Sequence, residues 1–308
     1  MTSFVFRRLL AVVPVFFVVS VVVFLLVHMV PGNPIDNLLR AGSSPAMRAQ
    51  MITRYGLDRG LLEQYVVWMR KVLTLDFGTS IIQGRAVAAL IAQNLPDSLI
   101  LGGAAFLFSA VTGIVAGVIA ARFYGTRVDS GITTGILLGS TIPSFWLGLL
   151  LILVFAVWLG WVPVSGSRGW SSLILPVVAT GLGGVALVAR VTKVTMIDIG
   201  RQDFVMLLRA KGLSEQSIRI RHILRHALIP VIAILGLRIG WVLGGAITVE
   251  VVFARPGLGS LLIRALNQRD YPVVQGCLLM LAMAVILGTV MGDIAQAAMD
   301  PRQREDSK

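Results

Sequence analysis

Long apolar runs separated by short polar stretches dominate this chain. Six runs reach about 20 residues, the length that a helix needs to cross the hydrocarbon core of a bilayer. They are Leu9–Val30, Ser98–Ala121, Ile132–Leu159, Leu173–Val191, Ile229–Phe253 and Val273–Ala298. The pattern therefore predicts an all-α integral membrane protein with six transmembrane helices.

The composition supports a membrane protein and changes how the charge is interpreted. Hydrophobic residues make up 56% of the chain, charged residues only 14%, and the mean hydropathy is +0.85. A net charge of +12 would suggest nucleic acid binding in a soluble protein. Here the basic residues flank the apolar runs, so they are topology signals. We expect membrane lipid, and no nucleic acid, as a partner.

The distribution of Lys and Arg predicts the orientation. Phe6-Arg7-Arg8-Leu9 resembles the positive flank of a signal peptide, but the apolar run that follows is too long and lacks a cleavage site. We therefore expect an uncleaved first span. With both termini in the cytoplasm, cytoplasmic segments hold 15 Lys and Arg residues and the short outer loops hold four. This asymmetry predicts a multi-pass plasma membrane protein with both ends inside.

The region between residues 31 and 96 is too polar to span. It contains Leu61–Met69, which is typical of an interfacial amphipathic helix with aromatic anchors. We expect an extracytoplasmic segment here, and both a structural role and partner contact remain open. The predicted organisation is residues 1–93 for the first span and this segment, 94–299 for a five-helix core with a cytoplasmic loop at 193–228, and 300–308 for a cytoplasmic tail.

The most informative polar stretch is Arg190–His226, which holds eight Lys and Arg residues. At its centre lies Arg209-Ala210-Lys211-Gly212-Leu213-Ser214-Glu215. We expect Gly212 to end one helix in the left-handed conformation, and Ser214 to cap the next helix with Glu215 in its first turn. That second helix is predicted to be amphipathic. Its apolar face would carry Ile220, Ile223, Leu224, Ala227 and Leu228, and its polar face Arg219, His222, Arg225 and His226. An elbow of this kind is suited to docking a cytoplasmic protein.

Several kinds of chemistry are missing from the sequence. No glycine precedes a lysine, so the chain has no phosphate-binding loop and is not itself an ATPase. Cys277 is the only cysteine, and His28, His222 and His226 have no further ligand at suitable spacing. We therefore predict no catalytic residue, no metal site and no cofactor.

Arg238 is the one basic residue in the middle of a predicted span, within Gly236-Leu237-Arg238-Ile239-Gly240. A charge at this depth is costly and is often functional. One interpretation is that Arg238 faces a water-filled pathway and an anionic part of a substrate. The other is that it pairs with a carboxylate or carbonyl inside the bundle.

A series of motifs resembles the permease subunits of binding-protein-dependent ABC importers, in the dipeptide/oligopeptide/nickel branch (DppB/OppB-like). These motifs, in order, are Val30-Pro31-Gly32-Asn33-Pro34, Tyr55-Gly56-Leu57-Asp58, Gln64-Tyr65, Asp76-Phe77-Gly78-Thr79-Ser80, Ile142-Pro143-Ser144-Phe145-Trp146-Leu147-Gly148, Arg209 to Ser214, Arg225-His226-Ala227-Leu228-Ile229-Pro230, Val249 to Phe253, Pro256-Gly257-Leu258-Gly259, Arg269 to Gly276 and Asp300-Pro301-Arg302. Each is weak alone, but their order and spacing are specific.

The resemblance implies a type I importer permease fold and a role in ATP-driven uptake. It also implies that residues 209–215 form the coupling loop that enters a cleft of an ATPase subunit. In the broader superfamily this loop begins Glu-Ala-Ala; here Met206, Leu207 and Leu208 stand in those positions, and Gly212 carries over. The implied partners are a paralogous permease, two cytoplasmic ATPase subunits that bind the ATP, and an extracytoplasmic substrate-binding lipoprotein.

The cargo is less defined than the role. Di- and oligopeptides are the expected substrates, with nickel chelates and haem as alternatives within the same branch. A stand-alone secondary transporter is a competing function, but the chain lacks inverted repeats and intramembrane acidic runs. An intramembrane protease would need a Ser/His or His-Glu-x-x-His pattern, which is missing.

Overall fold

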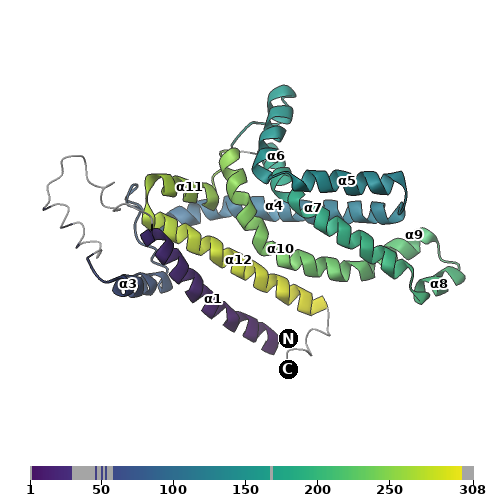
Figure 1. The fold of residues 1–308 in the computed structure, drawn as a ribbon, viewed down its shortest axis with the longest axis horizontal. Helices are drawn as coiled ribbons and strands as arrows, with labels where there is room; N and C mark the ends of the chain where they lie inside the picture. Colours follow the sequence, from purple (N-terminus) through teal and green to yellow (C-terminus); the bar gives the residue numbers. More distant parts are fainter. Residues whose placement is uncertain are drawn as a thin grey trace. The chain divides into compact units, whose positions relative to one another are not determined.

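The computed structural model describes residues 2–29, 46, 50, 53, 58–166 and 169–299. Within these ranges the chain is helical, as the sequence predicts, and forms no β-strand (Figure 1). The elements in chain order are α1 (Thr2–Met29), α3 (Leu61–Leu73), α4 (Val87–Arg122), α5 (Arg127–Thr141), α6 (Ser144–Leu151), the π-helix η2 (Ile152–Trp158), α7 (Ser171–Gly200), α8 (Asp203–Ala210), α9 (Glu215–Ser217), the π-helix η3 (Ile218–Ile223), α10 (Leu224–Val252), α11 (Leu258–Gln268) and α12 (Tyr271–Met299).

Hydropathy and helix length agree with the predicted membrane crossings. Five helical segments of the described chain are long and apolar enough to span: Val5–Met29, Val87–Arg122, Ser171–Gly200, Glu215–Ile239 and Tyr271–Ala297. A sixth crossing arises if α5 and α6–η2 together count as one span. The motifs at 31–34 and 55–57, the pair at 301–302 and the tail 300–308 lie outside the described residues.

The third predicted span is not one straight helix. Arg127–Thr141 and Ser144–Trp158 meet at an angle of 103°. The break falls at Ile142 and Pro143, which have extended backbone with ψ near 127° and 136°. Proline disfavours the helical conformation in the residue before it, so Pro143 ends α5 and lets α6 begin in a new direction.

The described residues fall into two compact units. The first comprises Met1–Leu9, Leu99–Arg255 and Val285–Lys308, and the second comprises Leu10–Ser98 and Pro256–Ala284. In the first unit, α7 packs against α5, α6 and α10. Small residues permit the close approach of helices in this unit. A Cβ added at Gly113 of α4 would lie 2.6 Å from the Cβ of Val188 on α7, and one at Gly292 would lie 2.1 Å from the carbonyl oxygen of Gly236.

The second unit contains the amphipathic α3 that the sequence predicts. Met69 and Val72 of α3 are buried and form a cluster with Leu279 of α12, bordered by Tyr65 and Trp68. The same unit buries Asp270, which begins the turn into α12 and accepts hydrogen bonds from the 80–82 loop. This unit is therefore held by both apolar contacts and a buried carboxylate.

Candidate functional site

The elbow between α8 and α9 has the local geometry that its residues predict. Gly212 has a φ of +80°, in the left-handed region that favours glycine. The amide of Gly212 donates to the carbonyl of Arg209 at 2.9 Å, and that of Leu213 donates to Leu208 at 3.3 Å. This pair of bonds is a Schellman motif that ends α8. Beyond it, the Ser214 hydroxyl accepts the amide of Ser217 at 3.3 Å and caps α9.

An ion pair joins the two sides of this elbow. The Nε of Arg209 donates to Oε1 of Glu215 at 2.7 Å, and its Nη2 donates to Oε2 at 3.4 Å. The hydrogen bond to Glu215 raises the pKa of the Arg209 guanidinium. Both side chains are about half exposed, at 49% and 56%, so salt screens the pair and it contributes little to stability. Its effect is to orient the loop around Gly212.

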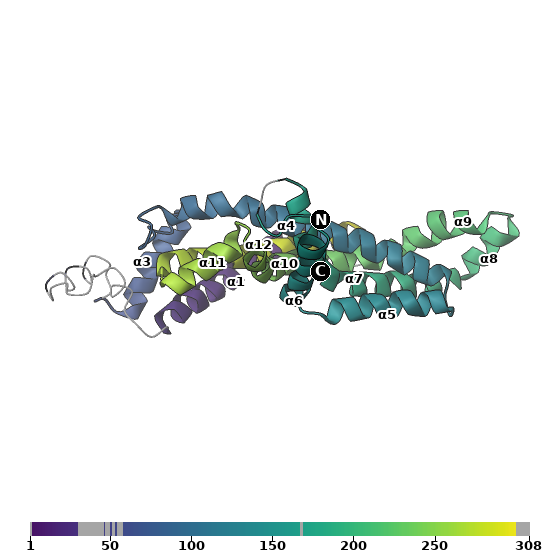
Figure 2. The same ribbon diagram turned by 90° about the horizontal axis from the view of Figure 1, so that it is seen from above.

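One face of the elbow packs onto the helices that enter and leave it. Val205, Ile218 and Ala227 are fully buried and form a cluster with Met196 and Ile199 at the end of α7. The opposite face of α8 is uncovered. Met206 is 70% exposed and Leu207 is 56% exposed, beside Arg209 and Lys211. Both views show α8 and α9 projecting past the α4–α5 turn (Figures 1 and 2). The elbow therefore presents an apolar and basic surface on a firmly packed base.

The predicted apolar face of the second helix is partly wrong. Ile220 was expected to face the bundle but is 54% exposed, whereas Ile218 is fully buried. The reason is that residues 218–223 form the π-helix η3 rather than an α-helix. The wider π turn places residues five apart on one face, so Ile218 and Ile223 pack together and Ile220 turns outward. Ile223 and Ala227 are buried as predicted.

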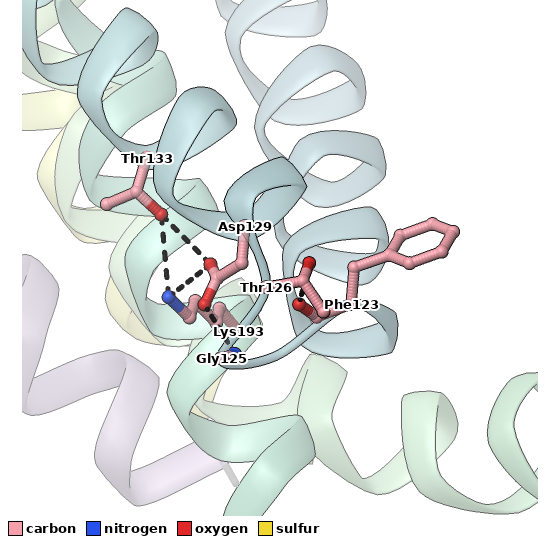
Figure 3. A network of polar contacts seen from close by, with 6 residues as sticks. All are labelled: Phe123, Gly125, Thr126, Asp129, Thr133 and Lys193. Atoms are coloured by element: carbon pink, nitrogen blue, oxygen red, sulfur yellow. Dashed lines mark hydrogen bonds and ion pairs between the residues drawn. The ribbon is translucent and has the colours of Figure 1, made fainter.

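A buried ion pair fixes α5 against α7, ten residues before α8 begins. Lys193 donates from Nζ to Oδ1 of Asp129 at 2.5 Å, and Thr133 donates to the same oxygen at 3.2 Å (Figure 3). The amide of Gly125 binds the other carboxylate oxygen at 3.2 Å. From the sequence, Lys193 counted only as a topology signal. The only sequence signal for this ion pair is that a lysine and an aspartate each border an apolar run. That the two side chains meet is shown only by the fold.

Arg238 lies in a cavity of about 260 Å³ within the first unit. Its Nη2 is 3.5 Å from the carbonyl oxygen of Gly183, at the outer limit of a hydrogen bond. Among the residues that the structure describes, no carboxylate forms an ion pair with Arg238. Four hydroxyl residues line the same cavity: Ser109, Ser140, Ser144 and Thr180. The sequence placed Arg238 in mid-span but did not indicate these hydroxyls, because they come from four other helices, α4, α5, α6 and α7.

In the described part of the chain, no three His, Cys, Asp or Glu side chains gather closely enough to hold an ion. Cys277 is fully buried.

Comparisons with known proteins agree with a membrane transport subunit. The family model for a binding-protein-dependent transport system inner membrane component matches residues 113–305, and the model for the N-terminal part of such membrane components matches residues 1–102. The glutathione transport system permease protein GsiC of Escherichia coli strain K12 is 39% identical over 308 residues, covering 99% of each chain. The GsiC of Shigella flexneri serotype 5b is 38% identical with the same coverage.

Solved structures agree at the level of fold. An inward-facing structure of the MetNI methionine ABC transporter, in its CY5 native crystal form, matches with a TM-score of 0.57 and 20% identity. It covers 68% of this chain and 96% of that one. A second crystal form of MetNI matches with a TM-score of 0.58 and 18% identity.

Proposed function

We infer the function from family membership, because the chain belongs to the binding-protein-dependent transport system inner membrane components, the permease subunits of ABC importers. It is an all-α, multi-pass inner membrane permease with the type I importer fold. The resemblance to the DppB/OppB branch is confirmed at this level. Of the six predicted spans, five are single helices of sufficient length in the described chain, and the sixth is the bent pair α5 and α6–η2 if that pair counts as one span. The stand-alone transporter and the protease have no support in these findings.

We propose that residues 209–215 are the loop through which ATP hydrolysis on partner subunits drives this permease. The observation that carries the proposal is the exposed α8–α9 elbow, in which Gly212 takes a φ of +80°. A Cβ at Gly212 would meet no atom of the chain within 4 Å, so the space beside it is open for a partner. Exposed Met206 and Leu207 supply apolar surface for that contact.

The same proposal defines the subunits of the transporter complex and the orientation of this chain in the membrane. Half of the pathway comes from this chain and half from a paralogous permease, with two cytoplasmic ATPase subunits and an extracytoplasmic binding protein. Both termini and the elbow lie in the cytoplasm, since the basic residues gather on that side. Residues 94–299 form the core with its coupling loop at 193–228, and 1–93 supply the first span and the extracytoplasmic segment.

Peptides are the proposed cargo. Support comes from GsiC, whose name assigns it to glutathione transport and which resembles this chain over nearly its whole length. Glutathione is itself a short peptide, so a small peptide with free carboxylates is the substrate class that this likeness favours. Nothing in the described residues favours nickel chelates or haem.

Co-purification and reconstitution test the proposal. A tagged chain purified from the membranes of its native host is expected to bring down a second permease and ATPase subunits. Proteoliposomes with the binding protein should then accumulate a labelled tripeptide when ATP is supplied. The chain purified without ATPase subunits should neither bind nor hydrolyse ATP. A chain that transports alone with an ion gradient would contradict the proposal.

A further inference from the structure

The cavity around Arg238 combines one cation with several hydroxyls and no described carboxylate. The guanidinium has five N–H donors, and the contact to the Gly183 carbonyl at 3.5 Å uses at most one of them well. Ser109 is 5% exposed and Ser140, Ser144 and Thr180 are partly buried, so the cavity that they line is partly open and lies within the bundle of the first unit. Charge in such a place is costly unless it is paired.

Thr180 adds an independent sign of an unfilled site. Its Oγ1 is buried, and no described residue offers it a hydrogen bond. Buried hydroxyls almost always have a partner, because leaving one unsatisfied costs the full desolvation of the group. Ser140 differs, since its hydroxyl donates to the carbonyl of Leu182 at 3.0 Å. The cavity therefore has several guanidinium donors ready for an acceptor, and one of its lining residues carries a buried hydroxyl without a described partner.

Gly184 keeps this arrangement possible. A Cβ at position 184 would lie 2.1 Å from the Ser109 hydroxyl and 2.3 Å from Nη1 of Arg238. Any larger residue would push both groups away from the α7 backbone. The absence of a side chain thus lets a hydroxyl from α4 and a cation from α10 meet at one point on α7.

We propose that the Arg238 cavity is a transient binding site for a carboxylate of the transported substrate. This rests on the proposed function of the chain as a peptide permease. A planar carboxylate is the acceptor that guanidinium binds best, through two parallel hydrogen bonds, and hydroxyls complete its coordination. A volume of about 260 Å³ is smaller than a typical drug-sized pocket, so it accommodates one end of a short peptide rather than the whole molecule.

The site also has consequences for selectivity. Arg238 repels a cationic group, so the amino end of a peptide is disfavoured here and the carboxyl end is favoured. Selection by charge in the membrane would act after the binding protein has delivered its cargo. The permease would then discriminate between a free acid and its neutral amide.

The test compares a tripeptide that has a free C-terminal carboxylate with the same tripeptide as a C-terminal amide. Uptake of each is measured in proteoliposomes containing the whole complex, after the affinity of the binding protein for each peptide has been determined separately. Arg238→Gln is expected to lower uptake of the acid at least about tenfold while changing uptake of the amide about twofold or less. Arg238→Lys should recover part of the lost uptake of the acid. Lysine keeps the positive charge but lacks the planar pair of N–H donors that binds a carboxylate through two hydrogen bonds.

Thr180→Val provides a second test that does not depend on the folding of Arg238→Gln. Valine has the shape of threonine and removes a buried hydroxyl that has no described partner, so assembly should be normal. Uptake of the acid should fall about threefold or more, and that of the amide should stay unchanged. Thr289→Val is the matched control, because the Thr289 hydroxyl bonds to Val285 of its own helix and does not line the cavity.

The outcomes separate the two proposals. If the wild-type complex takes up neither peptide, peptide transport itself is wrong. If it takes up peptides but Arg238→Gln lowers acid and amide equally, Arg238 has a structural role, such as pairing with the second permease, and the carboxylate site is overturned. Unchanged uptake of both peptides by Arg238→Gln and Thr180→Val overturns it as well.

Discussion

Asp270 and Ser80 lie 190 positions apart in the chain, yet the Ser80 hydroxyl donates to Oδ2 of Asp270 at 2.5 Å. Asp270 is 1% exposed and also accepts the amides of Ile81, at 3.1 Å, and Ile82, at 3.4 Å. One carboxylate therefore fixes the loop before α4 to the turn before α12. Both belong to the second unit.

Removing this carboxylate should destabilise the second unit. Asp270→Ala leaves a buried hydroxyl and two amides without their acceptor, at a cost of about 2–4 kcal/mol in the free energy of unfolding. Unfolding in mixed micelles, followed by circular dichroism, measures the change. Asp76→Ala is the control, because its carboxylate accepts one exposed amide, that of Gly78 at 2.9 Å. Equal losses in the two variants would contradict the importance of burial.

The pair of Asp129 and Lys193 should contribute more than an exposed ion pair does. Asp129→Ala leaves a largely buried ammonium without its carboxylate, so we expect about 2 kcal/mol of destabilisation. The double variant Asp129→Ala, Lys193→Met should lose less than the two single losses combined. Glu63→Ala serves for comparison, since it breaks the exposed pair with Arg59 and should change stability by under about 0.5 kcal/mol. Additive losses at Asp129 and Lys193 would show that they do not interact.

The orientation predicts which introduced cysteines react from outside the cell. Cys277 is fully buried, so the native chain gives a low background with a membrane-impermeant thiol reagent. Cysteines at the exposed positions Gln83 and Ser165 should be labelled in intact cells. A cysteine at Gln216, which is also exposed, should react only after the membrane is opened. Labelling of position 216 in intact cells would reverse the proposed topology.

Local patterns in the sequence predicted the helices and the elbow, because both depend on near neighbours. A run of about 20 apolar residues suffices to indicate a span, and Gly212 with Ser214 suffices to indicate a helix end followed by a cap. The break at Pro143 was also readable, since proline restricts the residue before it. Hydropathy alone predicts Ile132–Leu159 as a single span, because it does not contain this restriction.

Other features depend on contacts that no local pattern contains. The π-helix at 218–223, which brings Ile218 and Ile223 to one face and turns Ile220 outward, is not indicated by the apolar spacing of the sequence. The acceptor at Asp270 and the hydroxyls around Arg238 come from segments far apart in the chain. The sequence could show that these residues were polar within an apolar chain, but not which of them would meet.

The elbow offers the most direct test of coupling, through a matched pair of glycines. Gly212 and Gly125 have φ values of +80° and +78°, and an added Cβ would meet nothing within 4 Å at either position. Valine at each should therefore cost a similar amount, of order 1 kcal/mol or more, from backbone strain alone. Both variants should insert and assemble, because neither position lies in a predicted span.

Only Gly212→Val is expected to disconnect ATP hydrolysis from transport. Its side chain would project into the open space that we assign to the ATPase cleft, whereas Gly125 lies in the α4–α5 turn. Reconstituted complexes with Gly212→Val should lose uptake, and their ATPase activity should no longer respond to loaded binding protein. Complexes with Gly125→Val or Arg219→Ala should keep most of both activities, since strain or a lost surface charge does not block a docking surface. If complexes with Gly212→Val still couple ATP hydrolysis to uptake, the elbow is only a topological linker. If complexes with Gly125→Val lose uptake to the same extent, backbone strain causes the loss and a blocked docking surface does not.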